Sequence, residues 1–298
     1  MGRVPVFVLA LFIALTLGSA RESAAAVITS TANGGTWVTG STWVGGVAPA
    51  TTDTAIIATT GGNAVTLGAA ATIAGVTIDS GAILNGSSFI LTVNGNFANN
   101  GTFNGDTGTV VFYGGANLTV TRAISITGAA QFNNVTFYLY DSNSSVFAST
   151  FNITGGLNVG GTLAFTWYDN GCAGCSDDSM YINGAIYAKG NITGTMPRVY
   201  GTATITLDGT GAQTIGPFSD IPEGTLTINR TGVETGVVNL SGSMTFYVPF
   251  VLQAGTFNLD TYTLDVMNSF TLSGGTFNAG TGTVVFYGGA NLTVTRAI

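Results

Sequence analysis

The stretch that decides the fold is Gly101–Ile124, GTFNGDTGTVVFYGGANLTVTRAI, because the chain repeats it at Gly275–Ile298 as GTFNAGTGTVVFYGGANLTVTRAI. Only two positions differ: Gly105 and Asp106 of the first copy are alanine and glycine in the second. A self-match of this quality indicates a repeat architecture. Each copy contains a short alternating apolar and polar run, a glycine turn and a second short run, a pattern typical of two half-buried strands joined by a turn.

Related runs fill the rest of the chain. A degraded third copy places Thr204–Gly209 before Gln213–Ile215, and runs of the form apolar-Thr-apolar followed by Asn or Gly recur from residue 74 onward. The spacing between runs varies from about 12 to 30 residues, as expected of β-coils joined by loops of variable length. No segment after the N-terminal leader shows a helical period.

The composition points to the same class of structure. The 298 residues are 45% hydrophobic, enough for a sizeable core. Only 7% are charged, against roughly 25% in ordinary soluble domains. The polar surface must therefore consist of Thr, Ser and Asn, with 44 Gly for the turns. Such a surface suits stacked β-structure and does not suit amphipathic helices.

Two all-β architectures fit these observations. A right-handed parallel β-helix (β-solenoid) stacks each coil on the next, whereas tandem antiparallel β-sandwich domains would also show short strands with turn signals. The repeated unit is a strand–turn–strand rather than a whole domain, and no Pro-rich or charged linker separates domains. We therefore predict the β-solenoid, with the sandwiches as the alternative.

The N-terminus has the features of a secretory signal peptide. Arg3 precedes the apolar run Val4–Leu17, and Gly18-Ser19-Ala20 provides small residues before a cleavage site. We predict residues 1–20 as the signal peptide, with cleavage as late as residue 26. The apolar run is shorter than the roughly 20 residues of a membrane-spanning helix, and we predict no membrane span in the mature chain.

The mature chain is predicted to have two parts. Residues 27–75 contain Trp37 and Trp43 and are expected to cap one end of the stack, because an open end exposes core and strand edges. A sugar-stacking platform is the alternative role for these two rings. Residues 76–298 are predicted to form the solenoid repeats. The second copy stops where the first continues, so we expect a longer protein beyond Ile298.

The charged residues exclude several functions. The net charge is −7, and the seven basic residues are spread singly. Without a basic patch to neutralise phosphates, nucleic-acid binding is not expected. The chain contains no histidine, which removes imidazole from catalytic and zinc-ligand roles.

One segment, residues 166–179, interrupts the Thr/Gly rhythm and contains both cysteines. In an oxidising compartment we predict that Cys172 and Cys175 form a disulfide, with unpaired thiols as the main alternative. Asp169, Asp177 and Asp178 in the same segment are a weak candidate for a Ca²⁺ site, and a solvated acidic loop is the favoured interpretation of these three residues. No other cofactor is expected.

Aromatic residues sit within the predicted strands. In alternating strands one residue of each pair faces inward and the next outward. We predict an internal stack for the phenylalanines, as at Phe112 and Phe286. The neighbouring Tyr113 and Tyr287 would then face outward, where they would line a surface for sugars or partners.

Several stretches resemble repeats of large secreted bacterial surface proteins, the autotransporter- and adhesin-like β-helix proteins. They are FANNGTFN at 97–104 with GTVVF at 108–112, GTGAQTI at 209–215, and the opening from Trp37 to Asp53. The resemblance implies a secreted structural or adhesive protein at a cell surface, with surface glycans or proteins as partners. It carries over no catalytic residues.

The alternative function is an extracellular carbohydrate-active β-helix enzyme, a polysaccharide lyase or hydrolase. Such an enzyme needs two carboxylates about 5 to 9 Å apart. The acids of this chain are few and scattered, and sequence alone pairs none of them. We therefore predict that the protein is not an enzyme. Acids clustered in one groove would favour the enzyme, whereas a regular surface would favour display.

Overall fold

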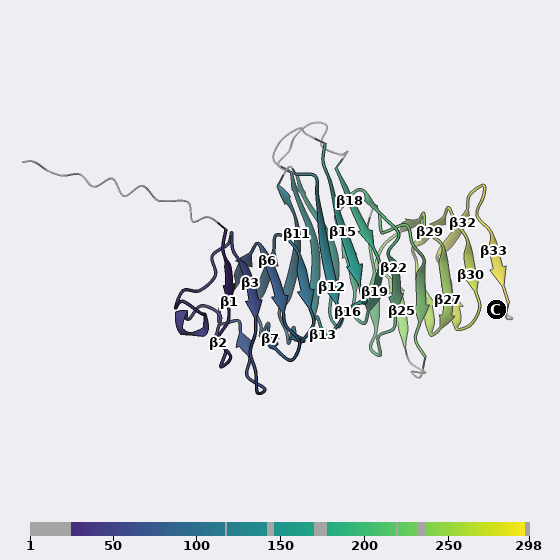
Figure 1. Ribbon diagram of the computed structural model, residues 1–298. Helices are drawn as coiled ribbons and strands as arrows, with labels where there is room; N and C mark the ends of the chain where they lie inside the picture. Colours follow the sequence, from purple (N-terminus) through teal and green to yellow (C-terminus); the bar gives the residue numbers. More distant parts are fainter. Residues whose placement is uncertain are drawn as a thin grey trace, which may run out of the picture.

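The chain winds into a parallel β-solenoid of about 11 turns (Figure 1). The computed structural model describes residues 25–116, 118–141, 146–169, 178–218, 220–231 and 236–295. Over these residues the only helix is a single 3-10 turn, η1 (Gly40–Thr42). Every ladder between the named strands described is parallel; the one antiparallel contact among them is an isolated bridge between Ser30 and Trp43. The prediction of an all-β solenoid is confirmed, and the antiparallel sandwiches are excluded.

The strands lie on three sides, which the chain visits in the order side 1, side 2, side 3. Side 1 is an eight-stranded sheet followed, after a break, by a three-stranded sheet. The first sheet contains β1 (Val27–Thr29), β3 (Thr54–Ile57), β6 (Gly75–Ile78), β9 (Phe97–Asn99), β12 (Val120–Ile126), β15 (Ala148–Thr154), β18 (Ser179–Asn183) and β21 (Val199–Tyr200). The second contains β26 (Met244–Phe246), β29 (Thr263–Val266) and β32 (Thr283–Phe286).

Side 2 is also divided into two sheets, which an isolated bridge between Phe132 and Val159 connects. The first sheet contains β2 (Gly35–Thr36), β4 (Val65–Thr66), β7 (Ile83–Asn85), β10 (Thr102–Asn104) and β13 (Ala129–Gln131). The second contains β16 (Leu157–Val159), β19 (Ala185–Ala188), β22 (Thr204–Leu207), β24 (Leu226–Asn229), β27 (Phe250–Ala254), β30 (Phe270–Leu272) and β33 (Leu292–Val294). The junction between the two sheets is called the side 2 seam below.

Side 3 is one continuous ten-stranded sheet. Its strands are β5 (Ala71–Ile73), β8 (Ile90–Val93), β11 (Thr109–Ala116), β14 (Asn134–Asp141), β17 (Leu163–Asp169), β20 (Ile192–Gly194), β23 (Gln213–Ile215), β25 (Val237–Leu240), β28 (Thr256–Asn258) and β31 (Thr276–Asn278). Because this sheet is unbroken, it offers the longest regular outer surface of the molecule.

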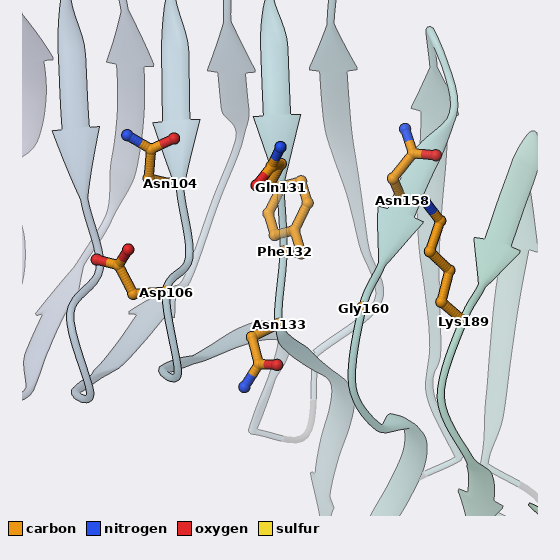
Figure 2. Close-up of a pocket in the computed structure, with 8 residues that line it drawn as sticks. All are labelled: Asn104, Asp106, Gln131, Phe132, Asn133, Asn158, Gly160 and Lys189. Atoms are coloured by element: carbon orange, nitrogen blue, oxygen red, sulfur yellow. The ribbon is translucent and has the colours of Figure 1, made fainter. Parts of the chain in front are cut away.

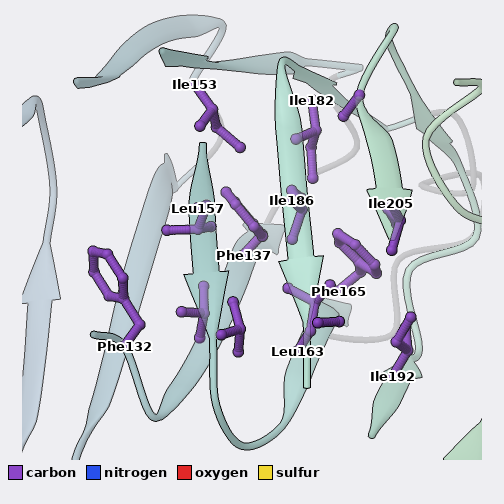
Figure 3. Packing of buried hydrophobic residues seen from close by; sticks show 14 of the residues in the cluster. Phe132, Phe137, Ile153, Leu157, Leu163, Phe165, Ile182, Ile186, Ile192 and Ile205 are labelled. Atoms are coloured by element: carbon purple, nitrogen blue, oxygen red, sulfur yellow. The ribbon is translucent and has the colours of Figure 1, made fainter. Parts of the chain in front are cut away.

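The core runs along the axis of the solenoid. Alternate residues of each strand point inward and stack on their equivalents one turn away, as Figure 3 shows for Phe137, Leu163 and Phe165. The ring centroids of Phe112 and Phe137 lie 5.6 Å apart, and those of Phe137 and Phe165 lie 5.9 Å apart. The buried stack leaves the intervening side chains of the same strands on the outside.

The middle turns are taller than the others (Figure 1). Strands β11, β12, β14, β15 and β17 have seven or eight residues each. Ser149 of β15 pairs with Met180 of β18, which pairs in turn with Val199 of β21. The first of these two turns therefore contains many more residues than the second. The longer strands extend the outer surface of side 3, which is where the candidate site lies.

Parallel stacking is already present at the N-terminal end of the described chain. Val27 of β1 pairs with Thr54 of β3, and Thr54 in turn pairs with Gly75 of β6. The coil ladder therefore includes strands within 27–75, the part predicted as a cap. No helix among the described residues is long and apolar enough to cross a membrane.

Candidate functional site

The candidate site is the outer surface of side 3 over β8, β11, β14 and β17, here called the tyrosine face. Alternation places Phe137 and Leu139 of β14 inward and Tyr138 and Tyr140 outward. Register then aligns outward residues of successive turns, so that Tyr113 faces Tyr138. The sequence thus builds an outward-facing row of aromatic rings, in which Tyr168 is exposed and the others are half-buried.

The outward tyrosines form two stacked pairs. The ring centroids of Tyr113 and Tyr138 lie 5.6 Å apart at an interplanar angle of 25°. Those of Tyr140 and Tyr168 lie 5.3 Å apart at 1°. Parallel rings at the spacing of adjacent strands present their edges and hydroxyls, together with the outer ring faces, to whatever lies on the surface.

A shallow hollow of about 740 Å³ lies over these strands. It is lined by Thr72, Ile90, Thr92, Asn94, Val111, Tyr113, Thr136, Tyr138, Ala164 and Thr166. None of these side chains carries a charge at neutral pH. Asn94 Oδ1 and Thr166 Oγ1 are buried and have no hydrogen-bond partner among the described residues. The hollow is chemically suited to an uncharged ligand with both apolar faces and hydroxyl groups.

Two phenols of this face, Tyr113 and Tyr138, have a raised pKa and stay protonated at neutral pH. Burial, followed by the neighbouring phenols Tyr138 and Tyr140, raises the pKa of Tyr113 above its usual value of 10.0. Burial and the phenols of Tyr140 and Tyr168 likewise raise the pKa of Tyr138. Each hydroxyl therefore remains available as both a donor and an acceptor of hydrogen bonds.

The predicted division of phenylalanines and tyrosines holds in the first copy but not in the second. Phe112 is buried and Tyr113 faces outward, as predicted, whereas both Phe286 and Tyr287 are exposed, at 41% and 44%. The sequence analysis did not identify Tyr138 or the tyrosines after it as part of one face. The motif Phe-Tyr-Leu-Tyr at 137–140 could have identified them, because Phe137 and Tyr138 repeat the Phe112-Tyr113 pair of the first copy.

The two tryptophans predicted to cap the stack lie in the first turn. Trp37 is 3% exposed and Trp43 is 1% exposed. Their ring centroids lie 5.0 Å apart in an edge-to-face arrangement, and Trp43 Nε1 donates to the Trp37 carbonyl at 2.7 Å. Buried rings leave no open face for a sugar. The capping role stays a prediction.

The predicted disulfide lies outside the described residues, because both Cys172 and Cys175 do. Of the three candidate calcium ligands, Asp177 also lies outside them, and Asp169 is the last residue of β17. Asp178 precedes β18 and is fully buried. Among the described residues no group of three or more Cys, Asp or Glu side chains gathers into a metal site. The calcium prediction stays untested.

Asp178 instead lies beside a second carboxyl that the sequence did not reveal. Asp178 Oδ1 accepts a hydrogen bond from the backbone N–H of Phe147 at 3.1 Å. Burial, together with the carboxyl of Asp141, raises the pKa of Asp178 to about 6. Two buried carboxyl groups in contact favour a shared proton over two charges.

A second polar site lies at the break in side 1, between β21 and β26. A hollow of about 510 Å³ there is lined by Pro197, Arg198, Tyr200, Asp220, Glu223, Tyr247 and Asn268. Asp220 accepts backbone N–H groups of Val199 at 3.2 Å and Ile221 at 2.9 Å. Burial raises the pKa of Asp220 to about 6, and the charge of Glu223 adds to the rise. Two carboxyls thus meet in one groove of a charge-poor chain.

Comparisons with protein-family models, with curated proteins and with solved structures return no match for this chain.

Proposed function

We propose that the protein is a secreted structural or adhesive repeat protein of a cell surface, which displays the tyrosine face to glycans or proteins. The observation that carries the proposal is the two stacked tyrosine pairs on an unbroken parallel sheet, beside a hollow that no charged side chain lines. A rod of stacked coils is stiff, because each coil is held by its neighbours along the whole axis. It would hold such a surface at a distance from its point of attachment.

Chemistry favours glycans as the partners of this face. Sugar rings have apolar C–H faces bordered by hydroxyl groups. Tyrosine rings with protonated hydroxyls, flanked by Thr72, Thr92 and Thr136, complement both features. An aromatic surface without charged side chains also binds independently of salt, unlike a surface that attracts polyanions.

The test is a panel of extracellular polysaccharides and whole cells, probed with the purified chain and with a Tyr113→Ala, Tyr138→Ala double variant. We expect binding to fall about 30-fold, since the two lost ring contacts are worth roughly 1 kcal/mol each, or roughly 2 kcal/mol together. Tyr187→Ala is the matched control, because Tyr187 is an outward tyrosine of side 2, 38% exposed. Equal losses in both variants, or no binding by the unaltered chain, would reject the proposal.

The second candidate function is carbohydrate cleavage at the side 1 break. The pair of Asp220 and Glu223 is the observation that favours it, because a carboxyl with a pKa of about 6 can serve as a general acid near neutral pH. Release of reducing ends from a polysaccharide panel would test it. Cleavage that disappears in both Asp220→Asn and Glu223→Gln would support an enzyme. Absence of cleavage across the panel would leave display as the function.

A further inference from the structure

The side 2 seam contains a hollow of about 370 Å³ whose lining differs from the tyrosine face (Figure 2). Side chains from four successive turns surround it: Asn104 of β10, Gln131 of β13, Asn158 of β16 and Lys189, which follows β19. Its volume falls within the range of small-ligand sites. It lies on a different side of the solenoid from the stacked tyrosines.

Outward amides elsewhere in the solenoid bond to a side chain one turn away. On side 2 itself, Asn85 Nδ2 donates to Thr66 Oγ1 at 3.3 Å, and Asn104 Nδ2 donates to Asn85 Oδ1 at 2.9 Å. On side 1, Asn183 Nδ2 donates to Asn152 Oδ1 at 2.8 Å. Such ladders satisfy polar side chains within the protein and leave little for a ligand.

The ladder stops at the seam. Gln131 pairs in register with Asn104, but among the described residues no hydrogen bond forms between their side chains. The side chains of Asn133 and Asn158 also have no hydrogen-bond partner in the described part of the chain. Three amides with free donors and acceptors therefore border one hollow. They match a ligand that carries several hydroxyl groups.

Two charges flank these amides from opposite ends. Asp106 lies at one end and Lys189 at the other, with Gln131 and Asn133 between them (Figure 2). Asp106 Oδ2 accepts the backbone N–H of Ser87 at 3.1 Å, which holds its carboxylate in place. Lys189 is exposed and makes no ion pair with any described residue. Its ammonium group is thus available to a ligand carboxylate.

We propose that this hollow binds a saccharide that carries a carboxylate, a uronic acid unit, through Lys189 and the seam amides. The carboxylate pairs with the Lys189 ammonium, and the hydroxyls bond to Gln131, Asn133 and Asn158. The carboxylate of Asp106 accepts a further hydroxyl at the far end. Nucleic acid does not fit, because its dense run of phosphates needs several cations and this hollow has one lysine, on a chain of net charge −7.

The experiment uses two matched ligands, trigalacturonate and its neutral counterpart galactotriose, titrated into the whole chain by calorimetry and followed by NMR at low salt. We expect trigalacturonate to bind about threefold more tightly, because an ion pair with an exposed lysine is worth less than a buried one. The preference should shrink as added salt screens the exposed pair.

Variants locate the site. Lys189→Met should remove the preference for trigalacturonate but leave the neutral ligand unaffected, whereas Asn158→Ala should weaken both. Arg122→Met is the charge-matched control, since Arg122 lies in β12 on side 1, and it should change neither. Equal affinity for both ligands, no binding of either, or a preference that survives Lys189→Met would overturn the proposal.

A variant of the tyrosine face is the last control for the binding experiment. Tyr138→Ala should leave trigalacturonate binding unchanged, because the seam and the tyrosine face are separate surfaces. Loss of uronate binding in Tyr138→Ala would place the ligand on the tyrosine face and overturn the assignment to the seam. The seam and the display function can thus fail independently.

Discussion

Gly101–Ile124 and Gly275–Ile298 differ at only two positions, yet the solenoid places them on different sides. The TVVF strand of the first copy is β11 on side 3, and that of the second copy is β32 on side 1. The degraded third copy places its equivalent strand, β22, on side 2. One strand–turn–strand unit therefore occupies all three sides of the same molecule.

The repeated unit specifies its own strands and the corner between them, but it does not specify the side of the solenoid on which it lies. The unit encodes two strands and the corner between them, because alternation and turn residues act locally. A parallel ladder offers each strand the same kind of partners on any side. The side on which a unit lies is therefore set by the chain that precedes it and not by the unit itself.

Burial also differs between the copies. Phe103 and Phe112 of the first copy are each 1% exposed, whereas Phe277 is half-buried and Phe286 is 41% exposed. In the first copy β11 pairs with both β8 and β14. In the second, β32 pairs with β29 alone among the described strands. The same sequence thus has neighbours on both edges in one place and on one edge in the other.

The largest expected difference is in amide hydrogen exchange. We expect residues 276–294 to exchange at least about 100-fold faster than residues 102–120, because opening a strand with one neighbour breaks fewer contacts. Mass spectrometry measures this in a single sample with peptides that span positions 105–106 and 279–280, because the rest of the two copies is identical in sequence. Equal protection of the two copies would show that each unit is stable without its neighbours.

The next prediction concerns the core phenylalanines. Phe112→Ala should cost about 3 to 5 kcal/mol, since the Phe112 ring packs within 5.6 to 6.2 Å of Phe97, Phe132 and Phe137. Phe286→Ala should cost less than about 1 kcal/mol, because its ring contacts Phe270 at 6.0 Å and is largely exposed. Urea unfolding would measure the two losses of free energy, and amide hydrogen exchange would show which region each substitution destabilises. Similar costs for the two variants would contradict this prediction.

Much of the fold could be predicted from the sequence, because strands and turns are specified by residues that are adjacent in the chain. Inward Phe112 and outward Tyr113 follow from alternation, which needs only adjacent residues. What could not be predicted depends on register between turns of unequal length, such as those that join Ser149 to Met180 and Met180 to Val199. A register shift between Tyr113 and Ala116 aligns Ala116 with Tyr140, and no local pattern announces it.

The candidate sites could not be predicted from the sequence, because they too depend on the register between turns of unequal length. Lys189 and Asp106 border one hollow although they are far apart in the sequence. Asp141 and Asp178 lie in contact across one turn, and sequence analysis had grouped Asp178 with its sequence neighbours instead. Sequence identifies which polar residues exist, whereas the lengths of the turns decide which of them meet.

A smaller effect is expected at the first of the two differing positions. A Cβ atom on Gly105 would lie 2.7 Å from the Gln131 carbonyl oxygen and 2.8 Å from the Asn133 nitrogen, both backbone atoms of the next turn. Gly105→Ala should therefore cost about 1 to 3 kcal/mol. The reverse change in the second copy, Ala279→Gly, should cost about 0.5 kcal/mol. Thermal unfolding of both variants measures these changes in the free energy of unfolding. A neutral Gly105→Ala would mean that the backbone at Gln131 and Asn133 shifts at little cost to admit the new Cβ atom.

The smallest effect is expected at the second differing position, where both copies have a left-handed backbone. Asp106 has φ +47° and Gly280 has φ +61°. Asp106→Gly relieves a left-handed strain of about 1 kcal/mol and loses the hydrogen bond to Ser87, also worth about 1 kcal/mol. We therefore expect thermal unfolding to show a change in the free energy of unfolding within about 0.5 kcal/mol.

The reciprocal substitution should not be neutral, because the residue one turn below is different. A Cβ atom on Gly280 would lie 2.5 Å from the carbonyl oxygen of Asp260. Gly280→Asp should therefore destabilise the second copy by about 1 kcal/mol, measured as faster exchange over residues 276–286. If the two reciprocal variants behaved alike, local sequence would decide stability at this corner. Asymmetry would show that the neighbouring turn decides it, as it decides the burial of the two copies.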